Sequence, residues 1–146
     1  MKVTDLLGNI SNWQLKGDII TKDTRDRSQY HINTRSIIKE VFPTTTVLEE
    51  VSIYIRPREV LFLDFYIPLH HLAVEVHGKQ HFEFVPHFHV DRYGFAKHKK
   101  RDNEKLEWCQ INNIRVIILS YNEDQDVWRN KLRLNETTNA NRGGCS

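Results

Sequence analysis

The stretch VLFLDFYIPLHHLAVEVH, residues 60–77, decides how the fold of this chain is interpreted. Two apolar runs, Val60–Ile67 and Leu72–His77, are separated by the short segment PLHH, whose proline favours a turn. Each run holds one carboxylate among its apolar residues, Asp64 in the first and Glu75 in the second. The pattern predicts two neighbouring antiparallel strands that each carry an acidic side chain.

Further strands are predicted on both sides of this pair. The run VLEEVSIYI, residues 47–55, alternates like a strand and precedes the pair, with the turn RPRE between them. The run IRVIILS, residues 114–120, is continuously apolar, as in a strand that is covered on both faces. A helix that crosses over between residues 72–77 and 114–120 would make these two strands parallel.

Three helical segments complete the pattern. They are a helix that begins at Asn33 or Thr34 and ends before Pro43, a helix over Phe95–Asn112, and a helix over about residues 124–134. In the second helix one stripe is expected to face inward, formed by Phe95, Lys99, Asp102, Leu106 and Cys109. The sequence therefore predicts an α/β fold, a mixed four-stranded sheet in the order helix, three strands, helix, strand, with helices on its faces.

The chain divides into an N-terminal arm, residues 1–32, a core domain, residues 33–134, and a flexible tail, residues 135–146. The arm has weak apolar spacing that allows a short helix, at Val3, Leu6, Leu7, Ile10 and Trp13. The tail is rich in Gly, Asn and Thr, which predicts disorder.

Length and composition exclude several classes of protein. A chain of 146 residues with 39% hydrophobic and 27% charged residues fits one compact domain. Its apolar runs are too short to span a bilayer, and its first residues lack the apolar region of a signal peptide, so we expect a cytoplasmic protein with no membrane partner. The two cysteines, Cys109 and Cys145, provide neither a disulfide framework nor a zinc-binding pattern.

Positive charge is concentrated in one stretch, although Lys and Arg together number 21 against 19 acidic residues. The segment RYGFAKHKKRDNEK, residues 92–105, holds six basic and two acidic residues. A phosphate backbone is one candidate partner for such a segment, and a solvated helix face is the alternative.

The two carboxylates indicate a metal site. Strand alternation places Glu75 and His77 on one face, and the short turn places Asp64 opposite them. Two neighbouring carboxylates repel, and a hard divalent cation such as Mg²⁺ or Mn²⁺ resolves the repulsion. The alternative is a pair of ordinary ion pairs, in which Asp64 meets Arg56 or Arg58 and Glu75 meets a lysine.

These residues resemble the PD-(D/E)XK nuclease superfamily, in particular the branch of very short patch repair endonucleases, EDxHD homing endonucleases and small phage-type nucleases. The segments FLDFYIPLHHLAVEVHGKQHFEF, residues 62–84, and KKRDNEKLEWCQINNIRVIILSY, residues 99–121, carry the resemblance. It implies a restriction-endonuclease-like core and metal-dependent hydrolysis of DNA in a bacterial cell or a phage-infected host. A chain this small would cut both strands most simply as a homodimer, and a nicking monomer is equally permitted.

The resemblance also implies roles for individual residues. Asp64 and Glu75 match the metal ligands, and Asp102 matches an acidic residue of the second helix. His77 stands where the wider superfamily has lysine and the repair branch has a catalytic histidine, which favours histidine chemistry. A second histidine, His81, would assist, with Lys79 as an alternative. DNA phosphates would be contacted by Lys97, Lys99, Lys100 and Arg101.

Two other interpretations stay open. A nuclease-like module that has lost catalysis would act as a nucleic-acid-binding or protein-binding factor. A structural zinc ion could be held by the histidine-rich segment, with His87, His89 and Asp91 as ligands. The zinc site of the repair branch uses cysteines, however, and none is present before Cys109, so we do not expect one.

Overall fold

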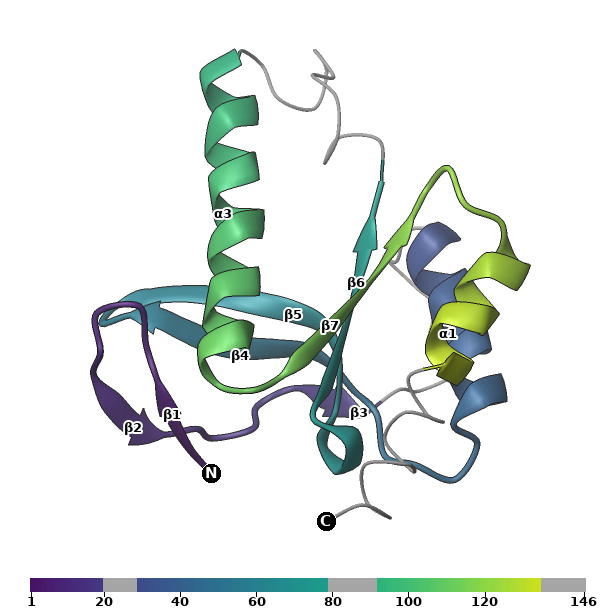
Figure 1. Ribbon diagram of the computed structural model, residues 1–146, viewed down its shortest axis with the longest axis horizontal. Coiled ribbons are helices and arrows are strands. Elements are labelled where there is room, and N and C mark those ends of the chain that lie inside the picture. The colour runs from purple at the N-terminus through teal and green to yellow at the C-terminus, as the bar shows by residue number, and fades with distance from the viewer. Residues whose placement is uncertain (20–28, 79–91, 135–146) are drawn as a thin grey trace.

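The computed structural model describes residues 1–19, 29–78 and 92–134 of the chain (Figure 1). The strands are β1 (Lys2–Thr4), β2 (Ile10–Asn12), β3 (Asp18–Ile19), β4 (Leu48–Arg56), β5 (Glu59–Ile67), β6 (Leu72–His77) and β7 (Arg115–Ser120). The helices are α1 (Gln29–Val41), α3 (Arg92–Ile111) and a helix over residues 125–134, with the short 3-10 helix η1 (Pro68–His70) between β5 and β6.

A five-stranded mixed sheet forms the centre of the fold, in the order β3-β4-β5-β6-β7. Its first three pairs are antiparallel, and β6 and β7 are parallel. The predicted α/β class and the four predicted strands are confirmed. The short strand β3, which comes from the segment expected to be an arm, adds a fifth strand at the edge beside β4.

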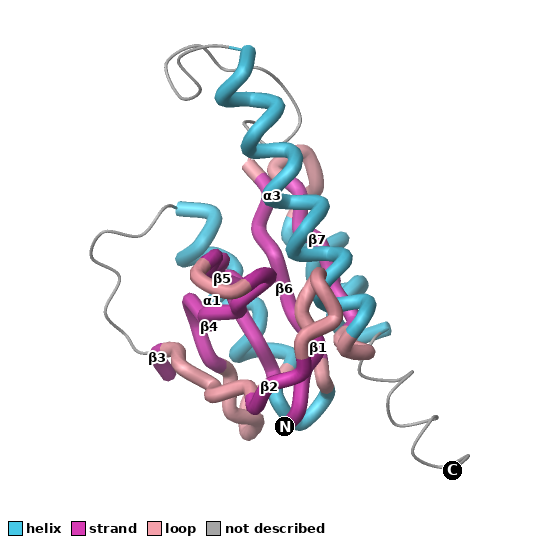
Figure 2. The backbone as a smooth tube through the Cα atoms, turned by 90° about the vertical axis from the view of Figure 1, so that its left-hand side faces the viewer, coloured by secondary structure: helices cyan, strands magenta, loops and turns pink. Residues whose placement is uncertain are grey.

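The helices lie on both faces of this sheet. Figures 1 and 2 show α3 on one side of β6 and β7, with α1 and the helix over residues 125–134 on the other side. Because α3 connects β6 to β7 across the sheet, the two strands run in the same direction, as the sequence predicts.

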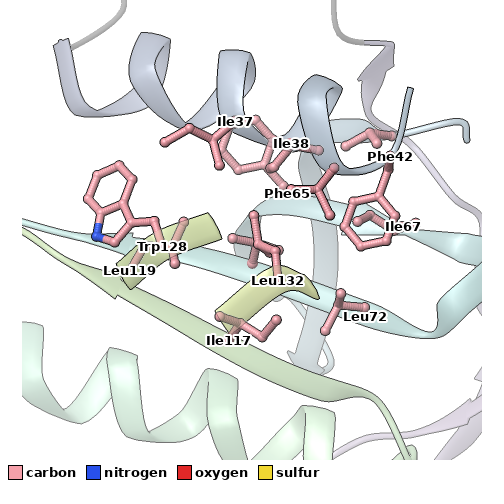
Figure 3. Packing of buried hydrophobic residues seen from close by; sticks show 13 residues of the cluster. Ile37, Ile38, Phe42, Phe65, Ile67, Leu72, Ile117, Leu119, Trp128 and Leu132 are labelled. Atoms are coloured by element: carbon pink, nitrogen blue, oxygen red, sulfur yellow. The ribbon is translucent and has the colours of Figure 1, made fainter. Parts of the chain in front are cut away.

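Each face of the sheet has its own hydrophobic core. Figure 3 shows the first core, where α1, strands β5 to β7 and the C-terminal helix meet around Ile38, Phe65 and Leu132. The second core contains Trp108 and Cys109 of α3, and it is joined by Tyr66, Ala73 and Trp13. Burial of these side chains fixes both the position of α3 and its rotation about its own axis.

Two local predictions are wrong. Helix α1 begins at Gln29, so Asn33 and Thr34 lie inside the helix and do not cap it. Thr34 is fully buried, and the next residue, Arg35, forms a buried ion pair with Glu49 of β4 at 2.8 Å between Nε and Oε1. These polar residues therefore serve helix–sheet packing, which a capping pattern does not anticipate.

The N-terminal residues form a β-hairpin, β1–β2, instead of the short helix that their spacing allowed. The Asp5 carboxylate accepts hydrogen bonds from the backbone amides of Leu7 and Asn9, and Gly8 has a φ of 89°, a conformation that glycine adopts readily. Turn chemistry therefore overrides the weak helical spacing.

Candidate functional site

The candidate site lies where β5 and β6 separate. The ladder between these strands ends at the pair Phe65 and Val74, whereas β6 continues to pair with β7 as far as His77. Asp64 and Glu75 are the next residues in the register beyond the last β5–β6 pair. As predicted, these two acidic residues lie opposite each other.

Each of the two carboxylates binds a backbone amide of the opposite strand. The amide of Asp64 donates to Glu75 Oε2 at 2.8 Å, and the amide of Val76 donates to Asp64 Oδ2 at 2.8 Å. These two bonds satisfy backbone groups at the point where the strand ladder has ended. They also hold both carboxylates in fixed orientations at the same place.

Lys105 of α3 is a third member of the site that the sequence did not reveal. Its Nζ lies 2.9 Å from Glu75 Oε1, and the Glu75 side chain is only 3% exposed. The alternative prediction, in which Glu75 forms an ion pair with a lysine, is therefore confirmed for Glu75. The matching alternative for Asp64 is wrong for Arg56, which pairs instead with Glu104 at 2.6 Å and Glu59 at 3.1 Å.

The electrostatics of the site follow from burial and from the proximity of its charges. Burial, reinforced by the negative charge of Glu75, raises the pKa of Asp64 to about 7, although Lys105 and the Val76 amide act in the opposite direction. Burial disfavours the Lys105 ammonium, but Glu75 and Asp64 outweigh it and raise the pKa of Lys105. The Asp64 carboxyl is therefore partly protonated near neutral pH, while the Lys105 ammonium stays charged beside Glu75.

A large cleft opens beside Asp64. Its volume is about 1280 Å³, and its walls are the β4–β5 hairpin and one side of α3. The cations along the cleft are Arg56, Arg58, Lys97, Lys100, Arg101 and Lys105. Acidic residues that line it are Glu59, Asp64, Asp102 and Glu104. The cleft is thus lined by more cationic than acidic side chains, and Asp64 is one of its acidic residues.

The inward stripe predicted for the second helix is wrong in part. The buried residues of α3 are Glu104, Trp108 and Cys109, so the helix is rotated relative to the expected stripe. This rotation brings Lys105 to the carboxylates and leaves Asp102 half-buried at the cleft wall, where its charge acts on Lys105.

The same rotation of α3 places some of the four predicted phosphate-binding residues in the cleft and leaves one outside it. Lys97, Lys100 and Arg101 line the cleft, whereas Lys99 does not, and its Nζ lies 5.9 Å from the centre of the Phe95 ring. All four residues are basic, so charge alone does not distinguish them. The three that line the cleft do so because they lie on the side of α3 that faces it.

His77 ends β6 and is half-buried, and its backbone carbonyl accepts a hydrogen bond from the amide of Tyr121 at 2.9 Å. The predicted residues Lys79 and His81, and the candidate zinc ligands His87, His89 and Asp91, lie outside the described residues.

The donor set at the site suits a hard divalent cation. Within residues 1–19, 29–78 and 92–134, no group of three or more His, Cys, Asp or Glu side chains could hold a metal ion. Two carboxylates are enough for Mg²⁺, which keeps several waters and completes its shell with substrate phosphates. Asp64 and Glu75, beside an open cleft, fit this mode of binding.

Cys109, the cysteine among the described residues, does not supply a reactive thiol to the site. Cys109 is fully buried in the second core, and burial, with a smaller effect of Glu75, raises the pKa of its thiol to about 12. A thiol that stays protonated at neutral pH is a poor nucleophile.

Comparisons with known proteins identify one similar sequence. The chain is 39% identical over 61 residues to Uncharacterized protein 307L of Invertebrate iridescent virus 6, and the match covers 42% of this chain and 31% of the viral protein. This chain thus spans about a third of that relative. No family profile matches the chain, and no solved structure does. Among the described residues, the helices are all too short or too polar to cross a bilayer.

Proposed function

We propose that this chain is a metal-dependent DNA endonuclease that hydrolyses phosphodiester bonds. The observation that carries the proposal is the pair Asp64 and Glu75, which lie opposite each other where β5 and β6 separate, with Asp64 lining a cleft that is also lined by cations. The likeness of residues 62–84 and 99–121 to PD-(D/E)XK nucleases supports the same function.

Asp64 and Glu75 would hold the metal ion through hard oxygen donors. A bound Mg²⁺ or Mn²⁺ supplies polarisation of the phosphodiester and a lowered pKa for an attacking water. Because the pKa of Asp64 is raised to about 7, this carboxyl must give up its proton before it can act as a ligand. Metal binding by the chain should therefore release a proton near neutral pH.

The remaining residues would position DNA and balance charge. Lys105 neutralises Glu75 at 2.9 Å and so keeps the acidic pair buried close to where a phosphate would bind. Lys97, Lys100 and Arg101 would bind phosphates on the α3 wall of the cleft. His77 and His81 remain the candidates for proton transfer to or from the reacting oxygens.

A catalytically inactive DNA-binding module is the second candidate, and one contact favours it. The ion pair between Lys105 and Glu75 already satisfies one carboxylate oxygen without a metal ion. Such a module would keep the charged cleft and would bind DNA, but it would not hydrolyse it.

Cleavage of supercoiled plasmid in Mg²⁺, Mn²⁺ or EDTA tests the proposal. We expect nicking only with a metal ion, and its loss in Asp64→Asn and Glu75→Gln. The matched controls are Asp126→Asn and Glu107→Gln, which change exposed carboxylates away from the site and should retain activity. If DNA of several sequences and structures is bound but never cut in any metal ion, the inactive module is the better description.

A further inference from the structure

We propose that the cleft between the β4–β5 hairpin and α3 binds an unpaired DNA strand, so that the substrate contains a single-stranded segment or the arm of a branch. The inference rests on the proposed nuclease function and names its substrate class. It is carried by two exposed aromatic rings, Phe62 and Tyr93, which line the same cleft as Asp64 and the cations.

Phe62 is placed to stack on a base next to the reacting phosphate. It precedes Asp64 by two residues on β5, about 7 Å along the strand, and both residues line the cleft. Phe62 is 49% exposed, although the next residue of the strand, Leu63, is fully buried. An exposed aromatic ring beside the carboxylates offers a stacking surface to any unpaired base.

Tyr93 supplies a second stacking surface on the opposite wall. It lies in the first turn of α3 and is 74% exposed. From Tyr93, residues Lys97, Lys100 and Arg101 recur at helical spacing along the side of α3 that lines the cleft. This stripe leads from an aromatic ring, past exposed cations, to Lys105 beside the carboxylates.

The β4–β5 hairpin, which forms the other wall of the cleft, also carries positive charge. Arg58 stands in the turn between β4 and β5 with a φ of 68° and is exposed, while Arg56 is engaged by Glu59 and Glu104. A groove with cations and an aromatic ring on each wall is the arrangement by which proteins hold single strands with little sequence preference.

The depth of the acidic pair also favours a flexible strand. Glu75 is 2% exposed and is paired with Lys105, which lines the cleft, so a phosphate must enter the cleft to approach it. A single strand can bend to bring one phosphate inward while its bases stack on the walls. Bases within a duplex are already stacked and paired, so the rings of Phe62 and Tyr93 could meet them only at the cost of unstacking.

Fluorescence anisotropy tests the inference with the full chain carrying Asp64→Asn, in EDTA, so that no cleavage occurs. The probes are one labelled oligonucleotide as a single strand, as a blunt duplex, as a forked duplex, and as the RNA strand of the same sequence. We expect the single strand and the fork to bind at least tenfold more tightly than the blunt duplex. Equal or tighter binding of the duplex, or a preference for the RNA, would overturn the assignment.

Variants then test the residues. Tyr93→Ala and Phe62→Ala should each weaken single-strand binding about tenfold. Arg58→Gln and Lys100→Gln should each reduce the slope of the logarithm of the affinity against the logarithm of salt concentration by about 0.7. The matched controls are Tyr54→Ala, an exposed ring on β4 outside the cleft, and Lys39→Gln, an exposed cation on α1. If the control variants lose as much affinity as the cleft variants, the cleft is not the binding surface.

The two proposals fail in different ways. Single-strand preference without cleavage in any metal ion would retain the binding assignment and overturn the nuclease function. Cleavage that depends on Asp64 but acts equally on a blunt duplex would retain the nuclease and overturn the assignment of the cleft to an unpaired strand.

Discussion

Asp64 and Glu75 are joined through the backbone, because the amide of Asp64 donates to Glu75 Oε2 while the Asp64 carboxylate accepts from the amide of Val76, both at 2.8 Å. The two acidic side chains thus replace the strand ladder where β5 and β6 separate. This arrangement keeps two carboxylates close together in a partly buried place, which is unfavourable unless a proton or a cation compensates.

Stability should depend on pH through Asp64. Its pKa is raised to about 7 in the folded chain, against about 3.9 when unfolded, so its contribution is complete below pH 4 and is lost as the pH rises through 7. In EDTA, we expect the free energy of unfolding of the wild type to fall between pH 5 and 8 relative to Asp64→Asn, by on the order of 2 to 4 kcal/mol. Urea unfolding at several pH values measures this, and parallel curves for the two proteins would contradict it.

Metal binding should stabilise the fold more strongly at higher pH. A divalent ion replaces the proton of Asp64, so the increase in Tm with Mg²⁺ or Mn²⁺ should grow between pH 6 and 8. Calorimetric titrations in two buffers of different ionisation enthalpy should show proton release. Asp64→Asn and Glu75→Gln should abolish the shift, whereas Glu107→Gln on the exposed side of α3 should retain it.

Removal of the Lys105 cation should destabilise the metal-free protein. Lys105→Met leaves Glu75 buried with an uncompensated charge, and breaking one partner of such a pair costs about 3 kcal/mol. The double variant with Glu75→Gln should recover much of this loss, because no buried charge is then left. Chemical denaturation of the four proteins gives the coupling, and a double variant whose loss equals the sum of the single losses would show that the pair is not coupled.

Packing of the N-terminal residues on the sheet can be tested at Gly17. A Cβ at this position would lie 2.7 Å from the Glu49 carbonyl oxygen and 2.8 Å from Val51 Cγ2. Gly17→Ala should therefore lower the free energy of unfolding by about 1 to 3 kcal/mol, because a backbone atom must move. Gln14→Ala, an exposed position in the same segment, serves as the control, and equal stability of both variants would show that this segment does not pack as described.

Local patterns were enough to predict strands β4 to β7. The runs at residues 60–67 and 72–77 are separated by four residues, so they pair as neighbours, and their alternation places Asp64 opposite Glu75. The parallel orientation of β6 and β7 likewise follows from the sequence, because α3 stands between them in the chain and crosses over the sheet. The start of α1 and the N-terminal hairpin were missed, because packing and turn chemistry outweigh weak local spacing there.

The sequence by itself determined four strands of the sheet, β4 to β7, and the pairing of the two carboxylates, because strand alternation and a short connection act over neighbouring residues. Only the tertiary structure decided which cation compensates them. The polar sequence of α3 has no single apolar stripe, so burial of Trp108 and Cys109 against the sheet sets its rotation, and that rotation brings Lys105 to Glu75. Contacts between distant segments are fixed by packing, and no local pattern in α3 specifies them.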